Sequence, residues 1–260
     1  MVPDRFDDPG AAYGYHRTLF DQVANGERPP TISIMLSSRH LGVTVRDTRR
    51  PGFEEAVRAA YEEDYPVLVR SAGGGPTAAG LGTFGFSVVR PSSTEEGRRG
   101  IRQRYDEAVA FALGALGRLG IRPEVGEVRD EFCPGDQSLR IGSWKDGMKI
   151  VGIAQRVTGR ATSVGGIVLV WGEDELARVL RRVYAAMGLP LRPDSVGSIR
   201  LAGSLAGVRD AMLAFAEEAK LHYGAVHTNL DGRTLELARK RHREYLVLPP
   251  SRREGIRPRS

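Results

Sequence analysis

Residues 131–156 constrain this chain most, because they combine its single cysteine with an apolar run that holds one lysine. Cys133 precedes a Pro-Gly pair, which favours a turn because proline fixes φ and glycine permits positive φ. Lys149 lies within Met-Lys-Ile-Val-Gly-Ile-Ala at 148–154, although lysine is rarely buried without a partner. A turn signal at 142–147 predicts a hairpin that brings Cys133 and Lys149 together.

A thiol and a lysine beside one acyl group suit acyl transfer through a covalent intermediate. Each residue taken alone also has an ordinary interpretation. A lone cysteine is commonly a small buried hydrophobe, and a lysine in a strand commonly faces solvent. Nothing in the sequence gives Lys149 a part in stability. Its replacement by alanine is therefore expected to abolish activity and to leave the fold nearly intact.

The glycine run at 73–75 is a second candidate binding element, and it follows a short β-branched segment that ends at Arg70. Consecutive glycines expose backbone N–H groups and let a ligand approach closely. The spacing and the Gly-Lys-Ser/Thr of a Walker loop are absent. Taken alone, the run is equally consistent with a plain loop, but its place after a strand that ends in arginine favours a ligand site.

The two blocks together resemble the lipoate-protein ligase and octanoyltransferase superfamily, over roughly residues 12–225. The matching segments are Glu-Phe-Cys-Pro-Gly at 131–135, Gly-Met-Lys-Ile-Val-Gly-Ile-Ala-Gln-Arg at 147–156, and Val-Arg-Ser-Ala-Gly-Gly-Gly at 69–75 with Gly82, Phe86 and Ser87 beyond it. The chain is most similar to the cysteine-dependent amidotransferase branch. That branch moves octanoyl or lipoyl groups from the glycine-cleavage H protein to other lipoyl domains.

Two positions depart from the wider family pattern. Many members carry a histidine shortly after the glycine loop, but Pro-Thr-Ala-Ala stands at 76–79 here. The amidotransferase branch also lacks that histidine, so this departure favours the branch. Asp136 stands where the branch tends to have a small hydroxyl residue. Some ATP-dependent ligases have an Asn-Asp pair in this region, so Asp136 keeps a ligase alternative open.

The resemblance implies that Cys133 takes an octanoyl or lipoyl group as a thioester and passes it to a lysine of a lipoyl-domain protein. Lys149 would favour the thiolate and bind the acyl carbonyl. The residues implied to bind substrate are Arg70, Ser71, Gly73, Gly74, Gly75, Gly135, Asp136, Gly152 and Ala154. Transfer needs no cofactor. In the ligase alternative, ATP and magnesium are required, with Lys149 at the acyl-adenylate and Asp136 near the metal.

A further alternative is an inactive homologue that only binds a carrier protein. The expected partners are lipoyl-domain proteins, namely the glycine-cleavage H protein and the E2 subunit of 2-oxoacid dehydrogenases, or an acyl carrier protein. Such carriers are typically acidic, and a net charge of +6 with a pI near 9.7 suits them.

Other classes of function find no support in the sequence. No zinc-finger spacing or aromatic-basic motif predicts nucleic-acid binding, and the five histidines show no metal-binding spacing. No apolar run is long enough to cross a membrane. One cysteine and a polar N-terminus that does not resemble a signal peptide predict a cytoplasmic location.

The order of elements indicates an α+β architecture. Hydrophobic periodicity and turn signals predict helices at 11–24, 53–63, 100–120, 173–187, 205–223 and 235–244, and strands at 31–36, 66–70, 82–89 and 161–171 besides the hairpin. Residues 92–100 are expected to form a polar connection. The resemblance implies the biotin/lipoate-protein ligase (class II synthetase-like) fold, a mixed and largely antiparallel sheet flanked by helices.

The chain is expected to form one catalytic domain over residues 11–248. Its first ten residues are expected to be flexible, because they are rich in Asp, Pro and Gly. A basic tail at 249–260 is also expected to be flexible and to be dispensable for catalysis.

Overall fold

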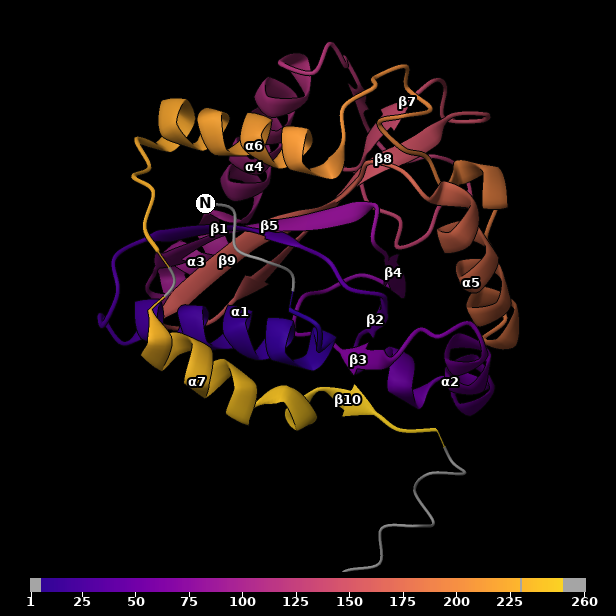
Figure 1. Ribbon diagram of the computed structural model, residues 1–260, viewed down its shortest axis with the longest axis horizontal. Helices are drawn as coiled ribbons and strands as arrows, with labels where there is room; N and C mark the ends of the chain where they lie inside the picture. The colour runs from indigo at the N-terminus through magenta and orange to yellow at the C-terminus, as the bar shows by residue number, and fades with distance from the viewer. Residues whose placement is uncertain (1–5, 230, 250–260) are drawn as a thin grey trace, which may run out of the picture.

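The computed structural model describes residues 6–229 and 231–249, and its strands form two sheets (Figure 1). Every pair of neighbouring strands in the six-stranded sheet is antiparallel. In spatial order the strands are β1 (Thr31–Leu36), β5 (Thr83–Pro91), β9 (Ala161–Leu169), β8 (Met148–Val157), β7 (Leu139–Ile141) and β6 (Glu124–Val125).

The four-stranded sheet contains the one parallel strand pair between named strands of the described residues, β2 with β3. Its strands, in spatial order, are β10 (Leu246–Val247), β3 (Val67–Val69), β2 (His40–Val43) and β4 (Thr77–Ala79). Mixed, largely antiparallel sheets with flanking helices confirm the predicted fold class.

Helices cover both faces of the large sheet (Figure 1). α1 (Pro9–Ala24) packs on one face, and α4 (Ile101–Gly117) with α6 (Val208–Tyr223) packs on the other. α2 (Phe53–Glu62) packs against α5 (Glu173–Ala186) beside the small sheet. The remaining helical segments are α3 (Thr94–Arg99), α7 (Gly232–Lys240) and the 3-10 turns η1 (Asp47–Arg49), η2 (Pro193–Ser195) and η3 (His242–Glu244).

Successive side chains of β5 point alternately into the core and toward the face that α1 covers. Phe84 and Phe86 point to the α4 and α6 side, where the ring of Phe215 lies 5.1 Å from Phe84 and 5.4 Å from both Phe86 and Phe111. All four rings are buried. Gly85, between the two strand phenylalanines, faces the opposite side, because successive residues of a strand alternate in direction. The missing side chain leaves space beneath α1.

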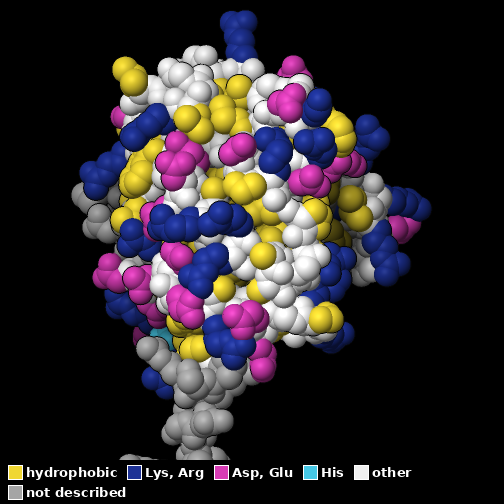
Figure 2. Space-filling model, turned by 90° about the vertical axis from the view of Figure 1, so that its right-hand side faces the viewer, with side chains coloured by type: hydrophobic (Ala, Val, Ile, Leu, Met, Phe, Trp, Pro, Cys, Tyr) yellow, Lys and Arg dark blue, Asp and Glu magenta, His cyan; other side chains and the backbone are white. Residues whose placement is uncertain are grey.

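The face that carries α2 and α5 has Lys and Arg side chains interspersed with Asp and Glu (Figure 2). Ion pairs connect the C-terminal end of α2 with α5: the guanidinium groups of Arg178 and Arg182 each lie 2.9 Å from a carboxylate oxygen of Glu63, and Arg182 also pairs with Glu62. The net positive charge of the chain is therefore not gathered into one patch on this face.

Two of the differences between the structure and the sequence prediction concern helices near 92–100 and near the N-terminus. The expected polar connection at 92–100 contains α3, which Ser93 and Glu96 begin with a reciprocal capping box. The first helix begins at Pro9 rather than at residue 11, with Asp8 as its N-cap, so the stretch predicted to be flexible includes part of that helix. Residues 1–5 and nearly all of the predicted basic tail lie outside the described residues.

We predict that Phe215→Ala lowers the free energy of unfolding by about 3–5 kcal/mol, because it removes a ring packed against three others. Urea unfolding measures the change. Leu213→Ala on the same helix is the control, since this side chain is 52% exposed and should change stability by no more than about 0.5 kcal/mol. Equal losses in both variants would contradict the assigned core.

Candidate functional site

A cavity of about 290 Å³ lies between α1 and the face of β5, β9 and β8. Its floor consists mainly of small residues that stand opposite one another in the strand register. In one row, Gly85 of β5 and Gly152 of β8 stand on either side of Ile167 of β9. In the next row on this face, Ser87 of β5 and Ala154 of β8 stand on either side of Gly165 of β9. A Cβ on Gly165 would lie 2.2 Å from the carbonyl oxygen of Phe86, so the backbones of β9 and β5 approach closely at this glycine. The missing side chains leave a trough over the sheet.

Cys133 lines one end of this pocket, on a turn with an uncommon backbone conformation. The residue with positive φ is Cys133 itself, at +44°, rather than Gly135 as the Pro-Gly pair suggested. Such a conformation is strained for a residue with a side chain and needs support from its surroundings. Tyr184 supplies it: its hydroxyl accepts the Cys133 N–H at 2.7 Å and donates to the Pro76 carbonyl at 2.9 Å.

The sulfur of Cys133 lies among donors of the glycine loop. Arg70 Nη2 is 3.3 Å and the backbone nitrogen of Gly75 is 3.2 Å from Sγ. Arg70 Nη2 also donates to the Gly75 carbonyl at 2.7 Å, which fixes the guanidinium. Gly74 makes the approach possible, because a Cβ there would lie 2.4 Å from Sγ. A cation and an N–H at the sulfur suit a thiolate, the nucleophilic form of cysteine.

Lys149 is close to the cysteine, as predicted, but its ammonium contacts other groups. Nζ donates to Glu131 Oε1 at 2.9 Å, to the Phe132 carbonyl at 3.0 Å and to the Cys133 carbonyl at 2.8 Å. These bonds occupy all three N–H donors of the ammonium. The side chain is 1% exposed. The expectation that Lys149 has no part in stability is therefore wrong, and the cation at the sulfur is Arg70.

Glu131 extends this network through the loop that carries the cysteine. Its Oε1 also accepts from Ser138 Oγ at 2.6 Å, and its Oε2 accepts the Val128 N–H at 2.9 Å. The carboxylate is buried, and the network compensates its charge. The pair formed by Lys149 and Glu131 thus fixes the backbone from residue 128 to residue 138, with Cys133 at its centre.

The other predicted binding residues divide into two groups. Arg70, Ser71, Gly152 and Ala154 line the pocket. Gly152 has a further purpose, because a Cβ there would lie 2.9 Å from Cε of Lys149. The residues that the structure does not place in the pocket lining are Gly73, Gly74, Gly75, Gly135 and Asp136. Of these, Gly74 and Gly75 act at the sulfur, whereas Asp136 is exposed.

Sequence reasoning missed the residues on the α1 side of the pocket. Tyr13 and His16 come from α1, His40 from β2 and Tyr245 from the segment before β10. Burial lowers the pKa of both His16 and His40 to about 4, so both imidazoles are neutral near pH 7. Burial raises the pKa of Tyr13 to about 12. The one sequence signal was the spacing of Tyr13, His16 and Phe20 on one helical face.

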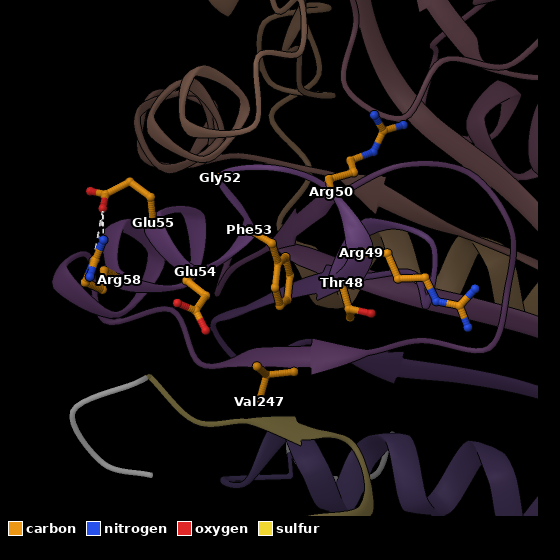
Figure 3. Close-up of a pocket in the computed structure, with 9 residues that line it drawn as sticks. All are labelled: Thr48, Arg49, Arg50, Gly52, Phe53, Glu54, Glu55, Arg58 and Val247. Carbon is orange, nitrogen blue, oxygen red and sulfur yellow. Dashed lines mark hydrogen bonds and ion pairs between the residues drawn. The ribbon is translucent and has the colours of Figure 1, made fainter. Parts of the chain in front are cut away.

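A second hollow of about 610 Å³ lies beside α2, away from the cysteine (Figure 3). Phe53 and Val247 face each other across it, and an ion pair between Glu55 and Arg58 borders it. Its lining holds neither cysteine nor lysine. This hollow therefore lacks both residue types that were predicted to carry acyl transfer, and the pocket at Cys133 is the candidate site.

Within 6–229 and 231–249, no three or more His, Cys, Asp or Glu side chains gather closely enough to hold a metal ion. No helix in the same part of the chain has the length and apolar content required to cross a membrane.

Residues 8–214 match the family model of the lipoyl protein ligase A/B catalytic domain. The chain belongs to this family. An octanoyl-GcvH:protein N-octanoyltransferase from Bacillus velezensis is 30% identical over 82% of the chain and 77% of the relative. A protein of the same name from Geobacillus kaustophilus is 27% identical over 68% of the chain, which spans 61% of that relative.

Solved structures of family members share the fold. A bipartite lipoate protein ligase from Thermoplasma acidophilum, described with its E2 lipoyl domain, has a TM-score of 0.67 at 16% identity, over 94% of this chain and 93% of that one. A lipoate-protein ligase A bound with ATP has a TM-score of 0.67 at 17% identity, over 90% of each chain. At these identities the comparison establishes the fold alone.

We predict that Lys149→Ala lowers the free energy of unfolding by about 3–5 kcal/mol, because it leaves the carboxylate of Glu131 buried without a counter-charge. Chemical denaturation measures the loss. Adding Glu131→Gln to this variant should cost less than the sum of the single changes, since both break one pair. Lys145→Ala, at an exposed neighbouring lysine, is the control. Unchanged stability in Lys149→Ala would mean that the pair does not hold the loop.

Proposed function

We propose that this protein is an acyltransferase that moves an octanoyl or lipoyl group onto a lysine of a lipoyl-domain protein through a thioester at Cys133. The observation that carries the proposal is the position of the sulfur. It lies at the end of a trough of small residues, within hydrogen-bonding distance of Arg70 and Gly75. The names of the relatives support octanoyl as the group and the glycine-cleavage H protein as the donor.

In the first step the Cys133 thiolate attacks the carbonyl carbon of the donor's acyl amide. A C–S bond forms, the C–N bond breaks, and the donor's lysine nitrogen takes a proton from water as it leaves as an amine. The acyl chain lies along the trough floor. Burying about six methylenes there contributes on the order of 5 kcal/mol to binding.

In the second step a neutral lysine amine of the acceptor attacks the thioester. A C–N bond forms, the C–S bond breaks, the acceptor nitrogen gives one proton to water, and the Cys133 thiolate is restored. Each step forms one acyl bond as it breaks another, so no ATP is required. Arg70 acts on the reacting sulfur, whereas Lys149 is a positioning residue that acts through the backbone carbonyl of Cys133.

The proposed partners are the H protein as donor and the E2 subunit of a 2-oxoacid dehydrogenase as acceptor. An acyl carrier protein is a second possible donor, and it presents a thioester rather than an amide. A thioester donor and the cysteine thioester have similar energies, whereas formation of the cysteine thioester from an amide is uphill. Acyl-enzyme should therefore accumulate with the carrier protein and only poorly with the H protein.

The ATP-dependent ligase alternative has weaker support. Arg70 and the Gly75 N–H, which could otherwise hold a phosphate, both donate to the cysteine sulfur. Asp136, the expected magnesium residue, is exposed and lies outside the pocket lining. The residues present do not fit a nucleotide and magnesium at this position. An inactive carrier-binding protein, the remaining alternative, would form no acyl-enzyme at Cys133.

We predict that Cys133→Ser loses the acyl-enzyme and nearly all transfer. The chain has one cysteine, so a hydroxylamine-sensitive mass gain after incubation with octanoylated acyl carrier protein identifies Cys133. Intact-protein mass spectrometry measures the gain without ATP. Asp136→Ala should transfer normally. If Cys133→Ser lipoylates an acceptor at the normal rate when given lipoate, magnesium and ATP, the ligase alternative replaces this proposal.

We also predict that Arg70→Met slows alkylation of Cys133 by iodoacetamide at neutral pH by about tenfold, which corresponds to about 1.4 kcal/mol. The reason is the loss of the guanidinium hydrogen bond to Sγ. Arg49→Met is the control, because this exposed arginine lines the other hollow. An unchanged alkylation rate in Arg70→Met would show that the guanidinium does not activate the sulfur.

A further inference from the structure

The segment 231–248, here called the C-terminal strap, lies beyond the part of the chain that matches the family, which ends at residue 214. The strap contains α7, η3 and β10 and runs along α1 (Figure 1). Two glycines of α1 let its backbone approach closely. A Cβ on Gly10 would lie 2.4 Å from the His242 carbonyl oxygen, and one on Gly14 would lie 2.4 Å from that of Ala238. The backbones of α1 and the strap are therefore built to pack together.

Polar contacts hold the strap at both of its ends. Arg241 Nη1 lies 2.8 Å from Asp21 Oδ2 on α1, and Gln22 Nε2 donates to Thr234 Oγ1 at 3.0 Å. At the other end, β10 pairs with β3, and the Val69 N–H donates to the Tyr245 carbonyl at 2.8 Å. The residue after Val69 is Arg70, which donates to the cysteine sulfur. The strap is thus attached directly beside the reacting group.

Tyr245 brings the strap into the pocket itself. Its side chain is part of the pocket lining, and its ring centroid lies 5.9 Å from that of Tyr13. Tyr13 in turn meets the edge of His40 at 5.3 Å. The outer wall of the pocket is therefore an aromatic row that begins on the strap, passes through α1 and ends on β2. Without Tyr245 the row would be open at its outer end.

We propose that the C-terminal strap is the water-excluding wall of the acyl-enzyme, with Tyr245 as the positioning residue that keeps Tyr13 over the acyl group. The inference rests on the proposed function. The acyl thioester can react with water as well as with the acceptor amine. Water then adds to the carbonyl carbon, a C–O bond forms, the C–S bond breaks, and free acid and the Cys133 thiol result. A closed wall suppresses this side reaction.

The test measures how the acyl-enzyme divides between hydrolysis and transfer. Full-length protein is loaded with octanoyl-coenzyme A, and loss of the acyl mass and release of octanoate are followed with and without an acceptor lipoyl domain. Tyr245→Ala should raise the ratio of hydrolysis to transfer about three- to tenfold, the size expected from losing one aromatic pair. Tyr245→Phe should restore the wild-type partition, because it keeps the ring.

Two further variants distinguish the loss of the water-excluding wall from a general loss of protein stability. Leu246→Ala changes the 37% exposed residue that follows Tyr245 and should divide between hydrolysis and transfer as the wild type does. Arg241→Gln weakens the attachment to Asp21 and should raise hydrolysis in the same direction as Tyr245→Ala. If hydrolysis in Tyr245→Ala and Arg241→Gln equals that of wild type, the strap is packing only, and the proposal fails while the transferase stands. A wild-type protein that forms no thioester overturns both.

Discussion

The ion pair between Lys149 and Glu131 is the interaction on which the candidate site depends. Buried pairs add little net stability compared with apolar residues of similar volume, but losing one partner is costly. Here the pair also binds four backbone or hydroxyl groups between residues 128 and 138. Its contribution is therefore geometric. It fixes the carbonyl of Cys133 from one side while Tyr184 fixes the N–H from the other, and together they hold a backbone conformation that a cysteine rarely adopts.

The site also requires neighbouring groups to approach the backbone closely, and a glycine makes this possible at each of three contacts. Gly74 admits the sulfur to the glycine loop, Gly152 admits the lysine stem beneath the trough, and Gly165 brings β9 against β5. A side chain at Gly74 or Gly165 would overlap the group it meets. The same absence of side chains creates the room for an acyl chain. The same small residues therefore determine both how closely the site packs and how much space its pocket leaves.

Much of this could be predicted from the sequence, because local signals were strong. The strand at 31–36 agrees with β1, and the hairpin correctly brings Cys133 and Lys149 together. The roles of the two cations could not be predicted. Sequence shows that a lysine is charged, but its partner is decided by a loop that folds over it. Tyr245 was also missed, because its place in the pocket depends on pairing between β10 and β3, which are far apart in the chain.

The chemistry proposed for the site explains why Arg70 contacts the sulfur and Lys149 contacts the backbone. A transferase whose acceptor is a lysine amine forms a thioester that any neutral amine can capture as a stable amide. A free lysine beside Cys133 would be such an amine, and self-acylation would end the cycle. Lys149 donates its three N–H bonds to a carboxylate and two carbonyls, so none of them is directed at the sulfur. Arginine is effectively always protonated. Arg70 can therefore donate to the sulfur without competing for the acyl group, and this explains why the residue at the sulfur is an arginine and the lysine is turned toward the backbone.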